Sequence, residues 1–186
     1  MKLFILVAAF SLTLIGCDNH KPVDKEILFN QFDFSYNDIF STCFSIKFTQ
    51  GDTVYIRQHW ASAFSDSLKS NESYRGILSD LERKKLDSFL TKIKFAKYDT
   101  SYYESYEDGQ YYEFFIKIDS FQKAIFVHSD SIPQELKDFG YWIVETKKKL
   151  RPVEIDTTLN FGSSKYFLPT YSPPPGIINF TPPKVE

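Results

Sequence analysis

The chain has 186 residues, with 22 basic and 24 acidic side chains and a formal net charge of −2 at pH 7. Without a basic excess the protein lacks the electrostatic footprint that binds a phosphate backbone, so nucleic acid is not an expected partner. Aromatic residues are abundant, with 19 Phe and 12 Tyr, and these residue types favour half-buried positions on pleated sheets. The composition therefore predicts a globular protein that contains a sheet.

The first 17 residues have the layout of a bacterial lipoprotein signal. Lys2 precedes an apolar run over residues 3–15, which is shorter than the ~20 residues that a membrane-spanning helix needs. The tetrapeptide Leu14-Ile15-Gly16-Cys17 resembles a lipobox, at which a prolipoprotein is diacylated on its cysteine and cleaved just before it. The alternatives are an uncleaved anchor and an ordinary secretory signal.

Cleavage at this site removes residues 1–16 as a signal peptide and leaves a mature chain of 170 residues with a net charge of −3. Acyl chains such as palmitate on Cys17, with a third chain on the new amino terminus, exceed the two signals that stable anchoring requires. We expect a lipid-anchored protein of the cell envelope, held at the inner or outer membrane and facing the periplasm. Residues 17–25 form a polar tether in this interpretation.

Lipidation of Cys17 leaves Cys43 as the only other cysteine, so no intramolecular disulfide is expected. The alternation of residue types around Cys43 is typical of a strand. No neighbouring cation is present in the sequence to lower the pKa of its thiol. We therefore interpret Cys43 as a small buried hydrophobic residue rather than a nucleophile.

The folded part of the chain is predicted to begin with strands. Apolar and polar residues alternate over 32–36 and again over 44–48. A turn that contains Gly51 then leads into a third strand over 54–60, which completes a hairpin. A short strand is expected over 74–78.

Two helices separated by a second hairpin follow. Ser79-Asp80-Leu81-Glu82 is a capping box, and apolar residues recur behind it at helical spacing as far as Ile93. Alternation over 112–118 and a returning strand over 123–128 predict the hairpin. The second helix has Pro133 in its first turn and an apolar stripe behind it.

This order predicts an α+β fold, in which an antiparallel sheet built from hairpins carries two helices packed on one face. We place this domain at residues 26–151. Six of the nine prolines lie in the last 18 residues, and proline cannot donate to a sheet ladder. Residues 152–186 are therefore expected to form a flexible tail, either extended or disordered.

Several strand and turn motifs between residues 40 and 150 carry a resemblance to a known family. They are Cys43-Phe44, Gly51-Asp52-Thr53-Val54-Tyr55, Tyr74-Arg75-Gly76, Asp108-Gly109-Gln110-Tyr111 and Pro133-Gln134-Glu135-Leu136. With these motifs the chain resembles a family of uncharacterised bacterial lipoproteins that is defined only by a domain of unknown function. The resemblance implies a small α+β domain on a lipid anchor, and it implies no activity, substrate or catalytic residue.

The sequence offers no convincing motif for catalysis, metal binding or cofactor binding. His20, His59 and His128 are not at metal-ligand spacing, and no cysteine is available to complete a zinc site. The tripeptide His128-Ser129-Asp130 has the residue types of a hydrolytic triad, but consecutive residues do not normally converge on one reacting atom. We assign no catalytic residue, no metal and no cofactor.

The segment from Tyr98 to Glu113 is the most suggestive part of the chain, because it concentrates six tyrosines and five carboxylates. Exposed tyrosines present flat apolar faces with a hydroxyl at the tip, which suit sugar rings or a protein surface. The candidate ligand-binding residues are Tyr102, Tyr103, Tyr106, Asp108 and Tyr111. The alternative, which we favour, is a connection whose tyrosines pack onto the sheet while its acids stay hydrated.

Three functions are compatible with these features. The leading hypothesis is a non-enzymatic, lipid-anchored domain that binds a partner or scaffolds an envelope complex. The second is a glycan-binding lipoprotein that uses the tyrosine-rich segment over 98–113. The third and least favoured is an envelope hydrolase that uses carboxylates such as Asp108 and Glu113.

Overall fold

The computed structural model describes residues 29–38, 42–59, 72–105 and 109–163. The predicted signal peptide, the lipidation site Cys17 and the tether lie outside the described residues. Two candidate binding residues, Tyr106 and Asp108, also lie outside them, as do residues 164–186 of the predicted tail.

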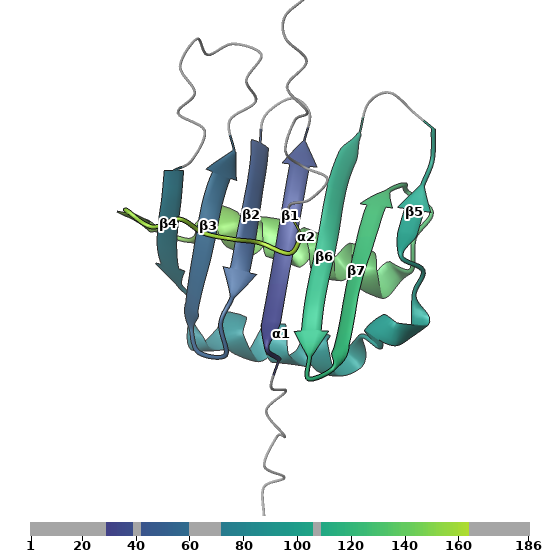
Figure 1. The fold of residues 1–186 in the computed structure, drawn as a ribbon, viewed down its shortest axis with the longest axis horizontal. Coiled ribbons are helices and arrows are strands. Elements are labelled where there is room, and N and C mark those ends of the chain that lie inside the picture. Colours follow the sequence, from purple (N-terminus) through teal and green to yellow (C-terminus); the bar gives the residue numbers. More distant parts are fainter. Residues whose placement is uncertain (1–28, 39–41, 60–71, 106–108, 164–186) are drawn as a thin grey trace, which may run out of the picture.

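The described residues form one eight-stranded sheet with the strand order β5-β7-β6-β1-β2-β3-β4-β8 (Figure 1). The strands are β1 (Gln31–Asp38), β2 (Thr42–Phe48), β3 (Thr53–His59), β4 (Glu72–Ile77), β5 (Ser101–Tyr103), β6 (Gln110–Ile118), β7 (Phe121–His128) and β8 (Val153–Ile155). All neighbouring strands are antiparallel except β5 and β7, which are parallel. The first strand of the chain, β1, thus lies in the middle of the sheet, and the later strands lie on both sides of it.

Two α-helices cover one face of this sheet and run across its strands (Figure 1). Helix α1 spans Asp80–Lys92 and α2 spans Gln134–Lys149, while the short 3-10 helix η2 covers Phe95–Lys97. The Ser79 hydroxyl accepts from the Glu82 amide and the Glu82 carboxylate accepts from the Ser79 amide, so the predicted capping box begins α1. The predicted α+β class, with an antiparallel sheet and two helices on one face, is confirmed.

Aromatic side chains form the centre of the core between helices and sheet. The ring of Phe139 in α2 stacks on Phe89 at 4.7 Å, on Phe32 at 5.3 Å and on Phe114 at 5.5 Å between centroids. Phe139, Phe32 and Phe114 are fully buried. Burial of each such ring contributes about 1.5–3 kcal/mol. The core therefore holds α2 firmly against β1 and β6.

The opposite face of the sheet is largely polar, and its central part is nonetheless buried. Strand alternation places Asp33, Ser35 and Ser45 on this face, and all three are fully shielded from solvent. After β8 the chain runs across this face in front of the strands (Figure 1). We call residues 156–163 the strap. Its last residue reaches β1, where the hydroxyls of Ser163 and Ser35 lie 2.8 Å apart.

The folded domain continues through β8 and the strap, beyond residue 151 where the sequence placed its boundary. Instead of leaving the domain, the chain pairs Val153–Ile155 with the edge strand β4 and then covers the polar face. The pairing involves three residues, and the Ser35–Ser163 contact joins positions 128 apart. A local sequence pattern cannot mark contacts of this kind, because strand prediction relies on runs of four or more alternating residues.

Candidate functional site

The tyrosine-rich segment contributes β5, which lies beside β7 at one edge of the sheet. Tyr102 packs against the core, and its hydroxyl accepts a hydrogen bond from the Asp99 amide at 3.1 Å. The ring of Tyr111 stacks on that of His128 with centroids 3.8 Å apart and planes 1° apart. Tyr103 keeps 64% of its surface exposed. The fold thus uses Tyr102 and Tyr111 for internal packing, as the favoured alternative predicted, and leaves Tyr103 open.

The tripeptide that follows β7 does not assemble a hydrolytic triad. His128 is fully buried, and its ring lies against Tyr111. The Ser129 hydroxyl accepts from the Ser131 amide at 2.9 Å, and the Asp130 amide donates to the Glu104 carboxylate at 3.0 Å. This last bond lowers the pKa of Glu104, with a further hydrogen bond from Ser129 in support. The contacts fix the loop after β7 beside α2.

A cleft of about 680 Å³ lies between α2 and the ends of β1 and β6. Its floor is aromatic and consists of Phe34 and Tyr36 from β1 and Tyr112 from β6. Tyr141 of α2 stands at its side with 69% of its surface exposed. This volume falls within the range of about 300–1,000 Å³ that small-ligand sites occupy.

Gly140 sets the width of the cleft on the α2 side. A Cβ atom at this position would lie 3.3 Å from the Tyr112 ring and 3.5 Å from the Phe114 ring. Glycine inside a helix costs roughly 0.5–1 kcal/mol relative to alanine, so its presence there needs a packing reason. Here the missing side chain lets α2 approach the floor of the cleft closely. This helical glycine is the sequence signal that would have located the site.

The charged residues at the mouth of the cleft balance one another. Lys137 lies 3.8 Å from the Asp130 carboxylate, and Lys148 lies 2.7 Å from the Glu145 carboxylate. The hydrogen bond that Lys148 donates to the Glu145 carboxylate raises the pKa of Lys148. Exposed ion pairs of this type contribute only about 0–1 kcal/mol, so their groups can exchange partners at little cost. The mouth thus offers two donors and two acceptors with no net charge.

Burial determines the protonation state of the tyrosine on the floor. It raises the pKa of Tyr36 to about 12, with a smaller contribution from the nearby Asp38 carboxylate. The phenol therefore keeps its proton at any physiological pH. The floor of the cleft remains uncharged.

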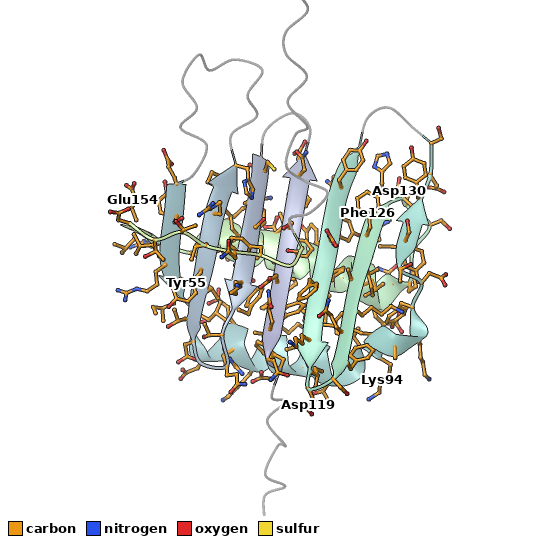
Figure 2. The ribbon with its side chains drawn as sticks, viewed as in Figure 1. Tyr55, Lys94, Asp119, Phe126, Asp130 and Glu154 are labelled. Carbon is orange, nitrogen blue, oxygen red and sulfur yellow. The ribbon has the colours of Figure 1, made fainter. Side chains whose placement is uncertain are left out.

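The cleft lies at the end of the sheet remote from the start of the described chain. Strand β1 begins at Gln31, and Tyr36 follows five residues later, which corresponds to about 17 Å along a strand. Near Gln31, the Asn30 side chain accepts from the amide of Asp119 in the β6–β7 turn. Figure 2 shows Asp119 at this end and Asp130, at the mouth of the cleft, near the other.

The polar face beneath the strap carries a second cluster of reactive residue types. The Ser45 hydroxyl lies 3.0 Å from Nε2 of His59 and 2.6 Å from the Ser35 hydroxyl. Burial, followed by the charge of Arg57, lowers the pKa of His59 to about 4, so its ring is neutral at pH 7. A serine–histidine contact occurs in nucleophilic catalysis, but Ser45 is fully buried and a substrate cannot reach it. We interpret the cluster as the attachment site of the strap.

Asp33 fixes the strap at its far end. Its Oδ2 accepts from the Gly162 amide at 2.7 Å and from the Gln31 side chain, while its Oδ1 is buried without a hydrogen-bond partner. Burial raises the pKa of this carboxyl, and the Gly162 hydrogen bond partly opposes the rise. The strap therefore belongs to the folded domain through specific polar contacts.

Comparison of the chain with protein-family models, curated proteins and solved structures finds no match. The resemblance to a lipoprotein family therefore stays a prediction. No helix among the described residues is both long and apolar enough to cross a membrane. The same residues contain no group of three or more His, Cys, Asp or Glu side chains placed to hold a metal ion.

Proposed function

We propose that this chain is a lipid-anchored protein of the cell envelope whose domain binds a ligand in the cleft between α2 and the sheet, without catalysing a reaction on it. The observation that carries the proposal is the cleft itself, which lies above the buried rings of Phe34 and Tyr36 and is bordered by the exposed Tyr141 and a rim of polar groups. Binding sites combine an apolar lining with a few polar groups in this way.

The position of the cleft supports the anchored arrangement. The lipidated residue is Cys17, and the described chain begins at Phe29. The intervening residues can reach at most about 40 Å when fully extended, at roughly 3.3–3.6 Å per residue. They join the domain at the end opposite the cleft. A domain held in this way presents the cleft away from the membrane, where an envelope ligand can enter it.

The anchor is tested by mass spectrometry of the protein isolated from membranes. We expect an amino-terminal Cys17 that carries acyl chains, and we expect Cys17→Ser to release the protein from the membrane fraction. A chain that retains Met1 and carries no fatty acid would contradict the anchored half of the proposal.

The cleft is tested by placing a photoreactive amino acid at position 141 in the anchored protein and irradiating living cells. Position 103 is the matched control, because Tyr103 and Tyr141 are similarly exposed and Tyr103 lies outside the cleft. We expect a discrete adduct from position 141 alone. The adduct should disappear in Gly140→Leu, whose side chain would press on the Tyr112 ring and distort the α2 side of the cleft, with folding checked by circular dichroism and urea denaturation. Equal adducts from both positions, or none from position 141, would refute the binding half.

A further inference from the structure

We infer that the ligand of the cleft is a neutral glycan, an inference that rests on the proposed binding function. The sequence placed its candidate sugar-binding tyrosines at 102, 103, 106 and 111. The structure gathers a different set around the cleft, namely Tyr36, Tyr112 and Tyr141.

The aromatic groups of the cleft suit the apolar faces of sugar rings. Tyr141 exposes most of its ring, and Tyr112 is partly buried against the core beside Gly140. Tyrosine combines a flat apolar face with a polar tip, which matches a pyranose with its C–H faces and its peripheral hydroxyls.

The charged groups of the cleft sum to zero, so they offer no net attraction to an ionic ligand. Its four charged groups are two carboxylates and two ammonium groups, each already in an ion pair. A phosphate or an acidic chain would meet Asp130 and Glu145, and a polyamine would meet Lys137 and Lys148. Like charges brought together at a binding surface cost affinity and suppress wrong partners. A neutral ligand avoids both conflicts.

The hydrogen-bonding groups of the cleft match hydroxyls, which both donate and accept. Carboxylates accept, ammonium groups donate, and the exposed amide of Gln110 does both. A lipid chain would cover these groups without offering hydrogen bonds, which is costly for buried polar groups. A neutral polyhydroxylated ligand is therefore the chemistry that satisfies the floor and the rim together.

The experiment uses the full lipoprotein in detergent micelles and measures binding by isothermal titration calorimetry. The probes are maltohexaose, cellohexaose and chitohexaose, with the hexamer of galacturonic acid as the anionic comparator. We expect at least one neutral hexamer to bind and to exceed the anionic hexamer in affinity. Tyr141→Ala should weaken this binding about tenfold, the size of effect typical of an aromatic contact residue. Tyr141→Phe should keep it, because the ring face remains.

The matched control is Tyr103→Ala, which removes an equally exposed tyrosine from outside the cleft and should leave affinity unchanged. Failure of all three neutral hexamers to bind overturns the inference, as does a preference for the anionic hexamer. Equal loss in Tyr103→Ala and Tyr141→Ala overturns it as well. If the sugars fail while position 141 still yields its cleft-dependent adduct in cells, the glycan is refuted and the binding function stands. If no sugar binds and position 141 yields no cleft-dependent adduct, both the glycan inference and the binding function are refuted.

Discussion

Replacing Gly162 with alanine tests whether the strap is an integral part of the fold. A Cβ atom at position 162 would lie 2.5 Å from the Phe115 ring, with two further ring atoms at 2.6 Å. Carbon atoms pack favourably at about 3.5–4.0 Å, so the strap or the ring must move by roughly 1 Å. Phe115 is itself almost fully buried on β6, next to the strand that carries Asp33, and has little room to yield.

The structure allows an estimate of the effect. Overpacking a filled site costs about 1–3 kcal/mol, and displacement of the strap also removes the 2.7 Å hydrogen bond from the Gly162 amide to the Asp33 carboxyl, a bond worth about 0.5–3 kcal/mol. Because these terms overlap, we expect Gly162→Ala to lower the free energy of unfolding by about 2 kcal/mol. Gly51→Ala is the matched control, since the nearest atom to its added Cβ is 3.9 Å away. It should stay within about 0.5 kcal/mol of the parent.

Urea denaturation of the full chain in detergent micelles measures both variants. Hydrogen exchange at residues 156–163 shows in addition whether the strap has loosened, because local openings expose amides without global unfolding. We expect faster exchange in the strap of Gly162→Ala and unchanged exchange in Gly51→Ala. Equal stability and equal strap exchange in the two variants would refute the packing described here.

Three further outcomes follow from the core and from the buried titratable groups. Phe139→Ala should cost about 3–5 kcal/mol in urea denaturation, because its ring contacts four other aromatic rings; a loss below about 1 kcal/mol would contradict its central position. Burial raises the pKa of Cys43 to about 11. Its thiol should therefore resist Ellman's reagent at pH 8 in the folded protein and react when denaturant is added. Rapid reaction without denaturant would be inconsistent with burial. The pKa of His59 falls from 6.5 to about 4 on folding, so the unfolded chain binds more protons than the folded one between these pH values. The free energy of unfolding should therefore decrease as the pH drops from 6.5 towards 4. His59→Gln should flatten this part of the stability profile, and an unchanged slope would argue against the buried neutral ring.

The regular elements of the fold could be predicted because each carries its own local pattern. Phe32, Phe34 and Tyr36 alternate with polar residues and point at the helices, and the Ser79 capping box sets the start of α1. Strands β5 and β8 were missed because each has three residues, too few for alternation to be recognised. Their positions depend on neighbours far away in the sequence.

The candidate site could be predicted only in part. The tyrosine-rich segment includes Tyr112, which lines the cleft. It also includes the candidate Tyr111, whose ring is instead occupied by His128. Phe34 and Tyr36 are buried core residues, as their alternation predicts, and nothing in that alternation indicates that they also line a cleft. The feature of the sequence that could have indicated the cleft is Gly140, a glycine inside a helix where α2 approaches Tyr112 closely.

The orientation of the domain on the membrane tests the central claim most directly. Single cysteines introduced at positions 119 and 130 carry a donor fluorophore, and the native lipoprotein is reconstituted into vesicles with an acceptor on the lipid headgroups. The buried, protonated thiol of Cys43 leaves labelling selective for the introduced positions. A domain anchored through Cys17 with its cleft facing outwards predicts stronger energy transfer from position 119 than from position 130. Equal or reversed transfer, or a protein that does not stay with the vesicles, would contradict it.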